Sequence, residues 1–342
     1  MAQDLTLNLL WLQSGGCGGC TLSLLCAEQP QLLARLEGAG IRLLWHPSLS
    51  RESGDEALEI LCACVEGRER LDLLCVEGSI MTGPKGTGRF HVLSGTGRPM
   101  MDWVRDLAAR AHQVLAVGTC AAFGGITAGG ITAGGGNPGG ALGLQYDGDH
   151  LGGLLGAGFR AGSGLPVINV AGCPTHPGWV LDSLQALALG RLGAADLDSL
   201  NRPRFYADHL VHHGCPRNEF YEFKASAEKP SDQGCMMEHM GCKGTQAHAD
   251  CNTRLWNGEG SCLRGGYPCI SCTEPRFETP GHPFAQTPKV AGIPIGLPTD
   301  MPKAWFVALA ALSKSATPKR VRENAVADHR VVTPAVRRTG LK

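Results

Sequence analysis

Residues 5–20 read LTLNLLWLQSGGCGGC, a largely apolar run followed by a small-residue turn that carries two cysteines. An apolar run bounded by serine and glycine is typical of a strand that is buried on both faces of a parallel sheet. Cys17 and Cys20 follow the strand that we expect over Leu5–Leu12. Because open parallel sheets bind ligands at the carboxyl ends of their strands, this stretch predicts both a sheet and the place of a bound group.

Similar apolar runs recur through residues 1–198, with helical patterns between them. Further strands are expected at Ile41–Trp45, Leu71–Val76, Gln113–Val117 and Leu165–Val170, and helices at 21–36, 55–64, 100–111 and 177–189. This alternation predicts an α/β domain whose parallel sheet is covered on both faces. Cys120 and Cys173 follow two of the strands, so we expect them at the same edge as Cys17 and Cys20. Glu77 is also expected at this edge. It either caps a helix or loop, or it lines the path from the bound group to a docked partner.

The composition excludes several classes of protein. The 342 residues carry a formal net charge of zero, which gives no sign of a nucleic-acid partner. The N-terminus lacks a secretion signal, and no apolar run approaches the roughly 18 residues of a membrane span, so we expect a soluble, cytoplasmic protein. The 15 cysteines are an odd number in a long chain, which argues against a secreted disulfide scaffold.

Most of the cysteines fall into three groups, each of the size that holds an iron–sulfur cluster. In chain order, the first group is Cys17, Cys20, Cys120 and Cys173, the second is His212, Cys215, Cys235 and Cys242, and the third is Cys251, Cys262, Cys269 and Cys272. One cluster can serve an active site, whereas three in one chain predict a relay for electrons. Structural zinc is the alternative for the third group taken alone. The remaining cysteines, expected to be buried thiols in apolar segments, are Cys26, Cys62, Cys64 and Cys75.

The second group contains an H-x-x-C pattern at His212 and Cys215. A neutral imidazole in place of a thiolate makes a cluster less negative, which raises its reduction potential. His213 is the competing ligand, and the spacing favours His212. In the third group, the four thiolates favour a 4Fe–4S cluster over a 3Fe–4S cluster.

Residues 199–342 are expected to form a second, mostly irregular domain. From Asn201 to Gly281 the sequence has little periodicity and is rich in Cys, His, Gly, Pro and Asn, so we expect bound clusters to tie it together. The basic tail over 314–342 has eight Lys or Arg against Glu323 and Asp328. The tail is either a solvated arm or a strap that docks a partner, and the valines at 331, 332 and 336 favour docking.

Several motifs occur in the order of one known family: WLQSGGCGGC, VGTCAAFGG, AGCPTHPGW, RPRFYADHLVHHGC, MGCKGTQAHADCNTRLWN and YPCISCTEPRF. On these motifs, residues 5–280 resemble the small, electron-transferring subunit of a nickel–iron hydrogenase. The resemblance implies a flavodoxin-like N-terminal domain and a looser iron–sulfur C-terminal domain. It also implies a separate large subunit that carries the nickel–iron site, so that no catalytic residue lies in this chain.

The resemblance further implies one cluster for each group. The first group would hold a proximal cluster that faces the nickel–iron site, and the second group a distal cluster near the surface. Within the third group, Cys251, Cys269 and Cys272 match the ligands of a medial cluster.

Three departures from the family pattern matter. Gly16 stands where many members have Glu, so a proton-transfer role of that Glu does not carry over. Cys262 stands where many members have Pro, which predicts a medial 4Fe–4S cluster. The export signal and membrane anchor of many members are not visible, and the SGGCGGCTLSLLC opening resembles the cytoplasmic branch.

Four functions remain open at this point. The C-terminal stretch TPKVAGIPIGLPTDMPKAWFVALAALSK resembles the hydrogen-sensing (regulatory) type, which predicts an H2 signal passed to a histidine kinase. The alternative within the family is a cytoplasmic uptake enzyme that feeds electrons to a carrier or quinone pool. A cluster subunit of a respiratory NADH-dehydrogenase-like complex resembles only the N-terminal domain, and the second and third groups argue against it. A zinc-stabilised binding module without a redox role is the last alternative.

Overall fold

The computed structural model describes residues 6–27, 32–129, 136–278, 289–290, 293–294 and 302–328. The chain forms two compact units, and each is described by itself. The first unit comprises residues 1–209 together with 272–282, and the second comprises residues 210–271 together with 283–342.

The first unit is built on one five-stranded sheet, in the order β2-β1-β3-β5-β9, with every neighbouring pair parallel. The strands are β1 (Leu7–Gln13), β2 (Ile41–Trp45), β3 (Leu73–Glu77), β5 (Gln113–Val117) and β9 (Ile168–Val170). All residues of β3 and β5 are buried, as expected for central strands covered on both faces. The predicted α/β fold with a flavodoxin-like parallel sheet is therefore confirmed.

The register of the sheet aligns the carboxyl ends of four strands. Gln13 of β1 pairs with Glu77 of β3, Glu77 lies beside Val117 of β5, and Val117 pairs with Val170 of β9. The loops that follow these strands consequently leave the sheet at one edge, which is where the first group was predicted.

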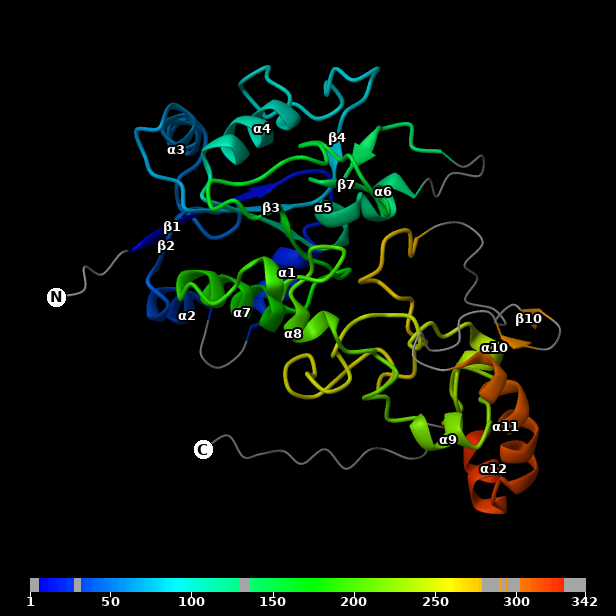
Figure 1. The fold of residues 1–342 in the computed structure, drawn as a ribbon. Coiled ribbons are helices and arrows are strands. Elements are labelled where there is room, and N and C mark those ends of the chain that lie inside the picture. The colour runs from blue at the N-terminus through cyan, green and yellow to red at the C-terminus, as the bar shows by residue number, and fades with distance from the viewer. Residues whose placement is uncertain are drawn as a thin grey trace. The chain divides into compact units, whose positions relative to one another are not determined.

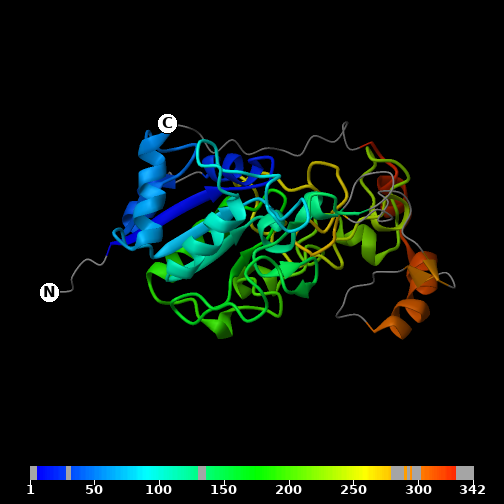
Figure 2. The same ribbon diagram turned by 90° about the horizontal axis from the view of Figure 1, so that it is seen from above.

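Helices cover both faces of the sheet. The helices α3 (Asp55–Glu66) and α4 (Met100–Arg110) lie on one face, and α1 (Gly19–Leu25), α2 (Leu32–Gly38) and α7 (Pro177–Ala188) lie on the other (Figure 1). The view from above shows α3 and α4 in front of the strands (Figure 2). On α4, buried Met100, Trp103, Val104 and Leu107 recur at helical spacing, which gives the helix one apolar face.

The prediction of one helix in this domain was wrong. The pattern over 21–36 gives two helices, α1 and α2, where one was expected, and residues 28–31 lie outside the described residues. The sequence places Pro30 between the two helices, and proline in a helix interior removes a backbone hydrogen bond.

Shorter elements complete the first unit. They are β4 (Ile80–Met81), α5 (Thr119–Phe123), α6 (Gly125–Ala128), β6 (Ala141–Leu142), β7 (Tyr146–Asp147), β8 (His150–Leu151), a 3-10 turn (Ala194–Asp196) and α8 (Arg204–Ala207). The last of these joins the unit through Tyr206, whose ring stacks on Trp179 at 4.3 Å. The Tyr206 hydroxyl donates to the Asn169 carbonyl at 3.0 Å and accepts from the Ala171 N–H at 3.1 Å. These contacts explain why the first unit continues past residue 198, the predicted domain boundary.

The second unit has little regular structure. Its elements are α9 (Asn218–Glu222), α10 (Met237–Met240), β10 (Lys289–Val290), β11 (Ile293–Pro294), α11 (Lys303–Ala316) and α12 (Lys319–Ala325). Val321 and Ala325 of α12 are buried against Ala225, with Phe220 and Phe223 alongside. Part of the basic tail is therefore a packed helix and not a free arm, because its apolar residues recur four positions apart.

Two further expectations concern the C-terminal part of the chain. The valines at 331, 332 and 336, on which the docking interpretation rested, lie outside the described residues. Within the described ranges, no helix is both long enough and apolar enough to cross a membrane.

Candidate metal-cluster sites

The first group lies at the carboxyl ends of three strands. Cys17 follows β1 and Cys20 lies in the first turn of α1, whereas Cys120 lies in α5 after β5 and Cys173 follows β9. The charges of Cys120 and Cys173 act on Cys20, and the charge of Cys17 acts on Cys120 and Cys173. The structure therefore brings these four thiols within electrostatic reach of one another, and their role as ligands stays a prediction.

Burial makes three of these thiols, those of Cys20, Cys120 and Cys173, poor acids in the absence of a cation. Burial first, and the neighbouring thiols second, raise the pKa of Cys120 to about 12 and that of Cys173 to about 11. Burial likewise raises the pKa of the Cys20 thiol far above its ordinary value. Coordination to iron removes the thiol proton outright. Bound iron would therefore offset the free-energy cost of burying a thiolate.

Glycines leave the space around these sulfur atoms free. At Gly118, where φ is +86°, an added Cβ would collide with Cys20 Sγ, and at Gly125, where φ is +54°, it would lie 2.8 Å from Cys120 Sγ. Both positions also have a backbone conformation that favours glycine. Close approach of backbone to the thiols is what a cluster site at this edge requires, and the first group fits one.

Glu77 acts as a cap behind the first group. Its Oε1 accepts from the Thr21 N–H at 3.0 Å, in the first turn of α1, and its Oε2 accepts from the Thr21 hydroxyl. Oε2 also accepts from Trp11 Nε1 and from Gln13 Nε2, both at 3.3 Å. Of the two roles left open for Glu77, these contacts are those of a helix cap, since an acidic group at a helix N-terminus satisfies its free amides.

A buried histidine adjoins this cap and was not found from the sequence. His46 Nε2 lies 3.5 Å from the Thr21 hydroxyl, and its ring lies 5.1 Å from the Trp11 ring. Burial lowers the pKa of His46 to about 4, although the charge of Glu77 opposes that shift. No motif marks His46, because only the pairing of β1 with β2 brings it beside Glu77.

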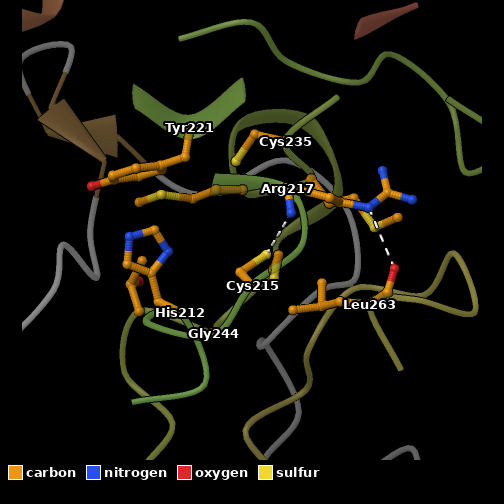
Figure 3. Close-up of a pocket in the computed structure, with 11 residues that line it drawn as sticks. His212, Cys215, Arg217, Tyr221, Cys235, Gly244 and Leu263 are labelled. Carbon is orange, nitrogen blue, oxygen red and sulfur yellow. Dashed lines mark hydrogen bonds between the residues drawn. The ribbon is translucent and has the colours of Figure 1, made fainter. Parts of the chain in front are cut away.

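The second group surrounds one cavity. A space of about 340 Å³, including its open mouth, is lined by His212, Cys215, Cys235 and Cys242 together with other residues (Figure 3). The His212 ring is set edge-on to the Tyr221 ring at 4.3 Å, whereas His213 is not among the residues that line the cavity. His212, and not His213, lines this cavity, and its role as a ligand stays a prediction.

Backbone amides point at the sulfur atoms of the second group. The Arg217 N–H donates to Cys215 Sγ at 3.4 Å (Figure 3). The Cys269 N–H donates to Cys242 Sγ at 3.3 Å. Burial raises the pKa of Cys215 to about 11, and the Arg217 N–H opposes that shift. Amides that favour a thiolate also tune a cluster bound to it, so the second group fits an iron–sulfur cluster.

Arg217 holds the loops of the second group together. Its side chain is 4% exposed, and Nη1 donates to the carbonyls of Asp232 and Gly234, both at 2.7 Å. Nε reaches the Leu263 carbonyl at 3.4 Å. Burial lowers the pKa of Arg217, while the thiols of the second group oppose that shift. Sequence reasoning missed this residue, although a basic side chain two positions after a candidate ligand was a usable signal.

The third group is divided between the units. Cys251, Cys262 and Cys269 belong to the second unit, whereas Cys272 belongs to the first. Within the second unit, the charge of Cys262 acts on Cys242, and the Lys243 N–H donates to the Cys269 carbonyl at 2.8 Å. The second and third groups therefore adjoin at Cys242 and Cys269. In the described part of the chain, no set of three or more Cys, His, Asp or Glu side chains is arranged to hold a single metal ion.

The cysteines outside the groups differ in burial. Cys64 and Cys75 are fully buried, as expected. Cys62 is only half-buried, and Cys26 is exposed, so the expectation of a buried thiol was wrong for Cys26. Cys26 directly follows α1 as its C-terminal cap.

Comparisons with known proteins cover both parts of the chain. Residues 17–187 match the family described as NADH ubiquinone oxidoreductase, 20 Kd subunit, and residues 207–285 match the family of the C-terminal region of NiFe/NiFeSe hydrogenase small subunits. The chain is 33% identical over 296 residues to the F420 non-reducing hydrogenase II small subunit of Methanosarcina mazei, which covers 81% of this chain and 75% of the relative. It is 32% identical to the periplasmic [NiFeSe] hydrogenase small subunit of Desulfomicrobium baculatum, over 81% of this chain and 86% of the relative.

A solved structure agrees with these relatives. The actinobacterial-type NiFe-hydrogenase from Ralstonia eutropha H16 superposes with a TM-score of 0.73 at 29% identity, over 92% of each chain. The fold and the paired family matches define an electron-transfer subunit that carries iron–sulfur clusters. The chain belongs to the family of NiFe hydrogenase small subunits. It is one part of a heterodimeric hydrogenase whose catalytic site lies on the large subunit.

Proposed function

We propose that this chain passes electrons between the large subunit and an outside partner through three 4Fe–4S clusters. The first group holds the cluster nearest the nickel–iron site, the third group holds the next, and the second group, with His212 as its nitrogen ligand, holds the last. Each cluster supplies one-electron redox chemistry when bound. The chain's own residues hold the thiolates, aim backbone amides at sulfur, and keep water from the buried thiols.

The observation that carries this proposal is the hydrogen bond from the Cys269 N–H to Cys242 Sγ, at 3.3 Å. It joins a residue of the third group directly to a residue of the second. A cluster with a purely structural role needs no such neighbour, whereas a relay requires adjacent groups. The Cys262 charge that acts on Cys242 supports the same adjacency.

We further propose that the output is an H2 signal for a histidine kinase. The support is the resemblance of the stretch over 287–314 to the sensing type, together with the surface of α11 in that stretch. Trp305, Leu309 and Leu312, spaced four and three residues apart on this helix, are exposed, Trp305 at 67% and Leu312 at 64%. Exposed apolar side chains at helical spacing are suited to contact with another protein.

The alternative within the family is an uptake role, in which the electrons enter a carrier or a quinone pool. A cytoplasmic location is also part of the proposal. Since the relative from Desulfomicrobium baculatum is periplasmic, fractionation of native cells and detection of this chain is the direct test of location.

An anaerobic purification of the tagged chain from its native cells tests the function. We expect a large subunit with paired C-x-x-C motifs, iron–sulfur signals that H2 reduces, and a co-purifying histidine kinase whose phosphorylation depends on H2. An electron carrier or membrane cytochrome in place of the kinase would support the uptake role. A colourless chain that contains zinc would contradict the proposal.

A pair of variants sharpens the test of the kinase. Replacing Trp305 and Leu312 with serine should release the kinase while the large subunit stays bound. The matched control is Leu189→Ser, since Leu189 is an exposed leucine of the first unit, at 51%. Loss of the kinase in the control as well would show that α11 is not the contact.

A further inference from the structure

Thr119 joins two ligand-bearing strand ends of the first unit. It is the first residue of α5, directly before Cys120, and its side chain is 1% exposed. The Thr119 N–H donates to the Gly172 carbonyl at 3.0 Å, and the Thr119 hydroxyl accepts from the Gly172 N–H at 2.9 Å. Gly172 directly precedes Cys173, so this double contact ties together the backbones that carry two members of the first group.

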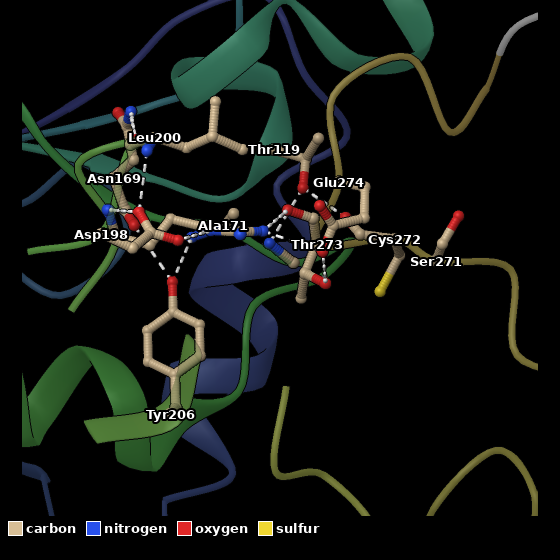
Figure 4. Close-up of polar contacts among 12 residues, drawn as sticks. Thr119, Asn169, Ala171, Asp198, Leu200, Tyr206, Ser271, Cys272, Thr273 and Glu274 are labelled. Carbon is tan, nitrogen blue, oxygen red and sulfur yellow. Dashed lines mark hydrogen bonds and ion pairs between the residues drawn. The ribbon is translucent and has the colours of Figure 1, made fainter. Parts of the chain in front are cut away.

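The same hydroxyl reaches a member of the third group. Thr119 Oγ1 donates to the backbone carbonyl of Cys272 (Figure 4). The direction of both bonds is fixed, because a carbonyl can only accept and a backbone N–H can only donate. The hydroxyl therefore uses its donor on Cys272 and an acceptor site on Gly172, and it connects both groups at once.

Separate contacts hold Cys272 in this place within the first unit. Arg202, 3% exposed, donates from Nη1 to the Thr273 carbonyl at 3.1 Å and to Glu274 Oε1 at 2.8 Å. Its Nε donates to Asp198 Oδ2 at 2.7 Å. A buried arginine that donates to three separate acceptors fixes the geometry of the segments that carry them. The Cys272 carbonyl is thus presented to Thr119 by the first unit's own residues.

We propose that the Thr119 hydroxyl is the bridge through which electrons pass from the first group to the third. This inference rests on the proposed function. Electron tunnelling weakens much more steeply across a gap than along covalent and hydrogen bonds, and Thr119 replaces a gap with a continuous bonded route from Cys120 and Cys173 to Cys272. The step moves one electron from the reduced first cluster to the oxidised third cluster. It breaks no bond, and the proton stays on Oγ1.

Two variants separate this role from a merely structural one. Thr119→Val has the same shape without the hydroxyl, and Thr119→Ser keeps the hydroxyl without the methyl group. Thr119→Ala is measured beside them, because it removes the hydroxyl without placing a methyl group against the Cys272 carbonyl. Glu274→Gln is the matched control, since it changes one acceptor of Arg202 while Arg202 can still donate to the Thr273 carbonyl next to Cys272.

The experiment uses the anaerobic heterodimer, mixed rapidly with H2 and frozen at successive times for electron paramagnetic resonance. We expect Thr119→Val and Thr119→Ala to delay reduction of the third cluster several-fold relative to the first, with unchanged iron content, reduction potentials and magnetic dipolar splitting. Thr119→Ser and Glu274→Gln should follow the wild type. A Val variant with assembled clusters and the wild-type delay would overturn the bridge, as would a Ser variant as slow as the Val variant.

Failure of the proposed function looks different in the same experiment. In that case H2 reduces no cluster in the wild type, and the bridge is overturned with it. Failure of the bridge alone leaves H2 reduction of both clusters intact and equally fast in every variant.

Discussion

The two units of this chain are held together by different means. The first unit has a five-stranded sheet with fully buried central strands and an apolar core that joins the sheet to α3 and α4. Between residues 210 and 271, the second unit has only α9 and α10, of five and four residues, and its described apolar cluster centres on Ala225, Val321 and Ala325. Burial of apolar surface is the main stabilising term in proteins, so the second unit lacks much of what stabilises the first.

Polar contacts take the place of a core in the second unit. The Arg217 side chain connects the carbonyls of three loop positions, at Asp232, Gly234 and Leu263. Backbone amides point at Cys215 and Cys242, the thiols of the cavity. We therefore expect the proposed clusters to contribute little to the stability of the first unit and much to that of the second.

Removal of the clusters should have the largest effect, and it should destabilise the second unit far more than the first. After anaerobic chelation of iron, we expect amides of residues 210–271 and of α12 to exchange with solvent as in an unfolded chain, while the amides of β1, β3 and β5 stay protected. Hydrogen exchange followed by mass spectrometry on the full chain measures both units in one sample.

Two reloading steps complete that experiment. Iron and sulfide should restore protection in the second unit, whereas zinc should not. Retained protection of residues 210–271 without iron would show that the second unit folds on its own contacts, and recovery with zinc would favour the zinc-stabilised alternative.

The sequence predicted the first unit well because its elements arise from local patterns. Ile41–Trp45 and Gln113–Val117 are strands with the predicted bounds. A short apolar run flanked by polar residues is typical of a buried strand in an α/β domain. The meeting of Cys17, Cys120 and Cys173 at one edge followed from the parallel order of the strands. Only the helix expected over 21–36 differed in kind, because an apolar pattern does not show where one helix ends and the next begins.

Contacts that depend on tertiary structure could not be predicted. The bond from Thr119 to Cys272 spans residues far apart in the sequence, and the anchor of Arg202 on Glu274 does the same. Neither residue type signals its partner, because a buried Thr or Arg satisfies its donors with whichever carbonyl the fold presents. His46 was missed for this reason too.

The second prediction concerns the relay and has an all-or-none outcome. Cys17→Ser should abolish H2-driven reduction of the second and third groups, because the first cluster loses a thiolate ligand at the point that receives electrons. Electron paramagnetic resonance of the H2-treated heterodimer measures it. Cys26→Ser is the matched control, since Cys26 is an exposed thiol outside the groups.

The outcome of that variant tests whether the first unit is the sole source of electrons for the second. Normal reduction of the other groups in Cys17→Ser, with the large subunit bound, would remove Cys17 from the relay. Loss of reduction in Cys26→Ser as well would point to damage at α1 and not to a lost ligand.

The third prediction concerns a variant that changes a cluster without abolishing it. Cys262→Pro should convert the cluster of the third group from 4Fe–4S to 3Fe–4S, because one thiolate is removed from a set of four. A new spin signal in the oxidised protein would report the conversion. Cys62→Ser, which removes a half-buried thiol of α3, serves as the control. An unchanged spectrum in Cys262→Pro would count against Cys262 as a ligand.

The smallest expected effect concerns the first unit alone and its response to acid. The pKa of His46 is lowered to about 4 by burial, from an ordinary value near 6.5. In the unfolded chain this histidine takes up a proton as the pH falls through about 6.5, whereas in the folded chain it resists protonation until about pH 4. The unfolded state therefore binds more protons in this window, and His46 makes the sheet less stable as the pH falls from 6.5 towards 4.

The loss due to His46 should amount to about 1–3 kcal/mol across that window. Hydrogen exchange of the β1 and β3 amides at a series of pH values, corrected for the intrinsic exchange rate, gives the free energy of opening. In His46→Gln the side chain cannot take up a proton, so its stability should vary less with pH than that of the wild type. Equal slopes in the two proteins would mean that His46 takes up its proton at the same pH in the folded and unfolded chain, so that the charge of Glu77 offsets the effect of burial on its pKa. The contrast between an apolar first unit and a polar second unit would then be smaller than the core suggests.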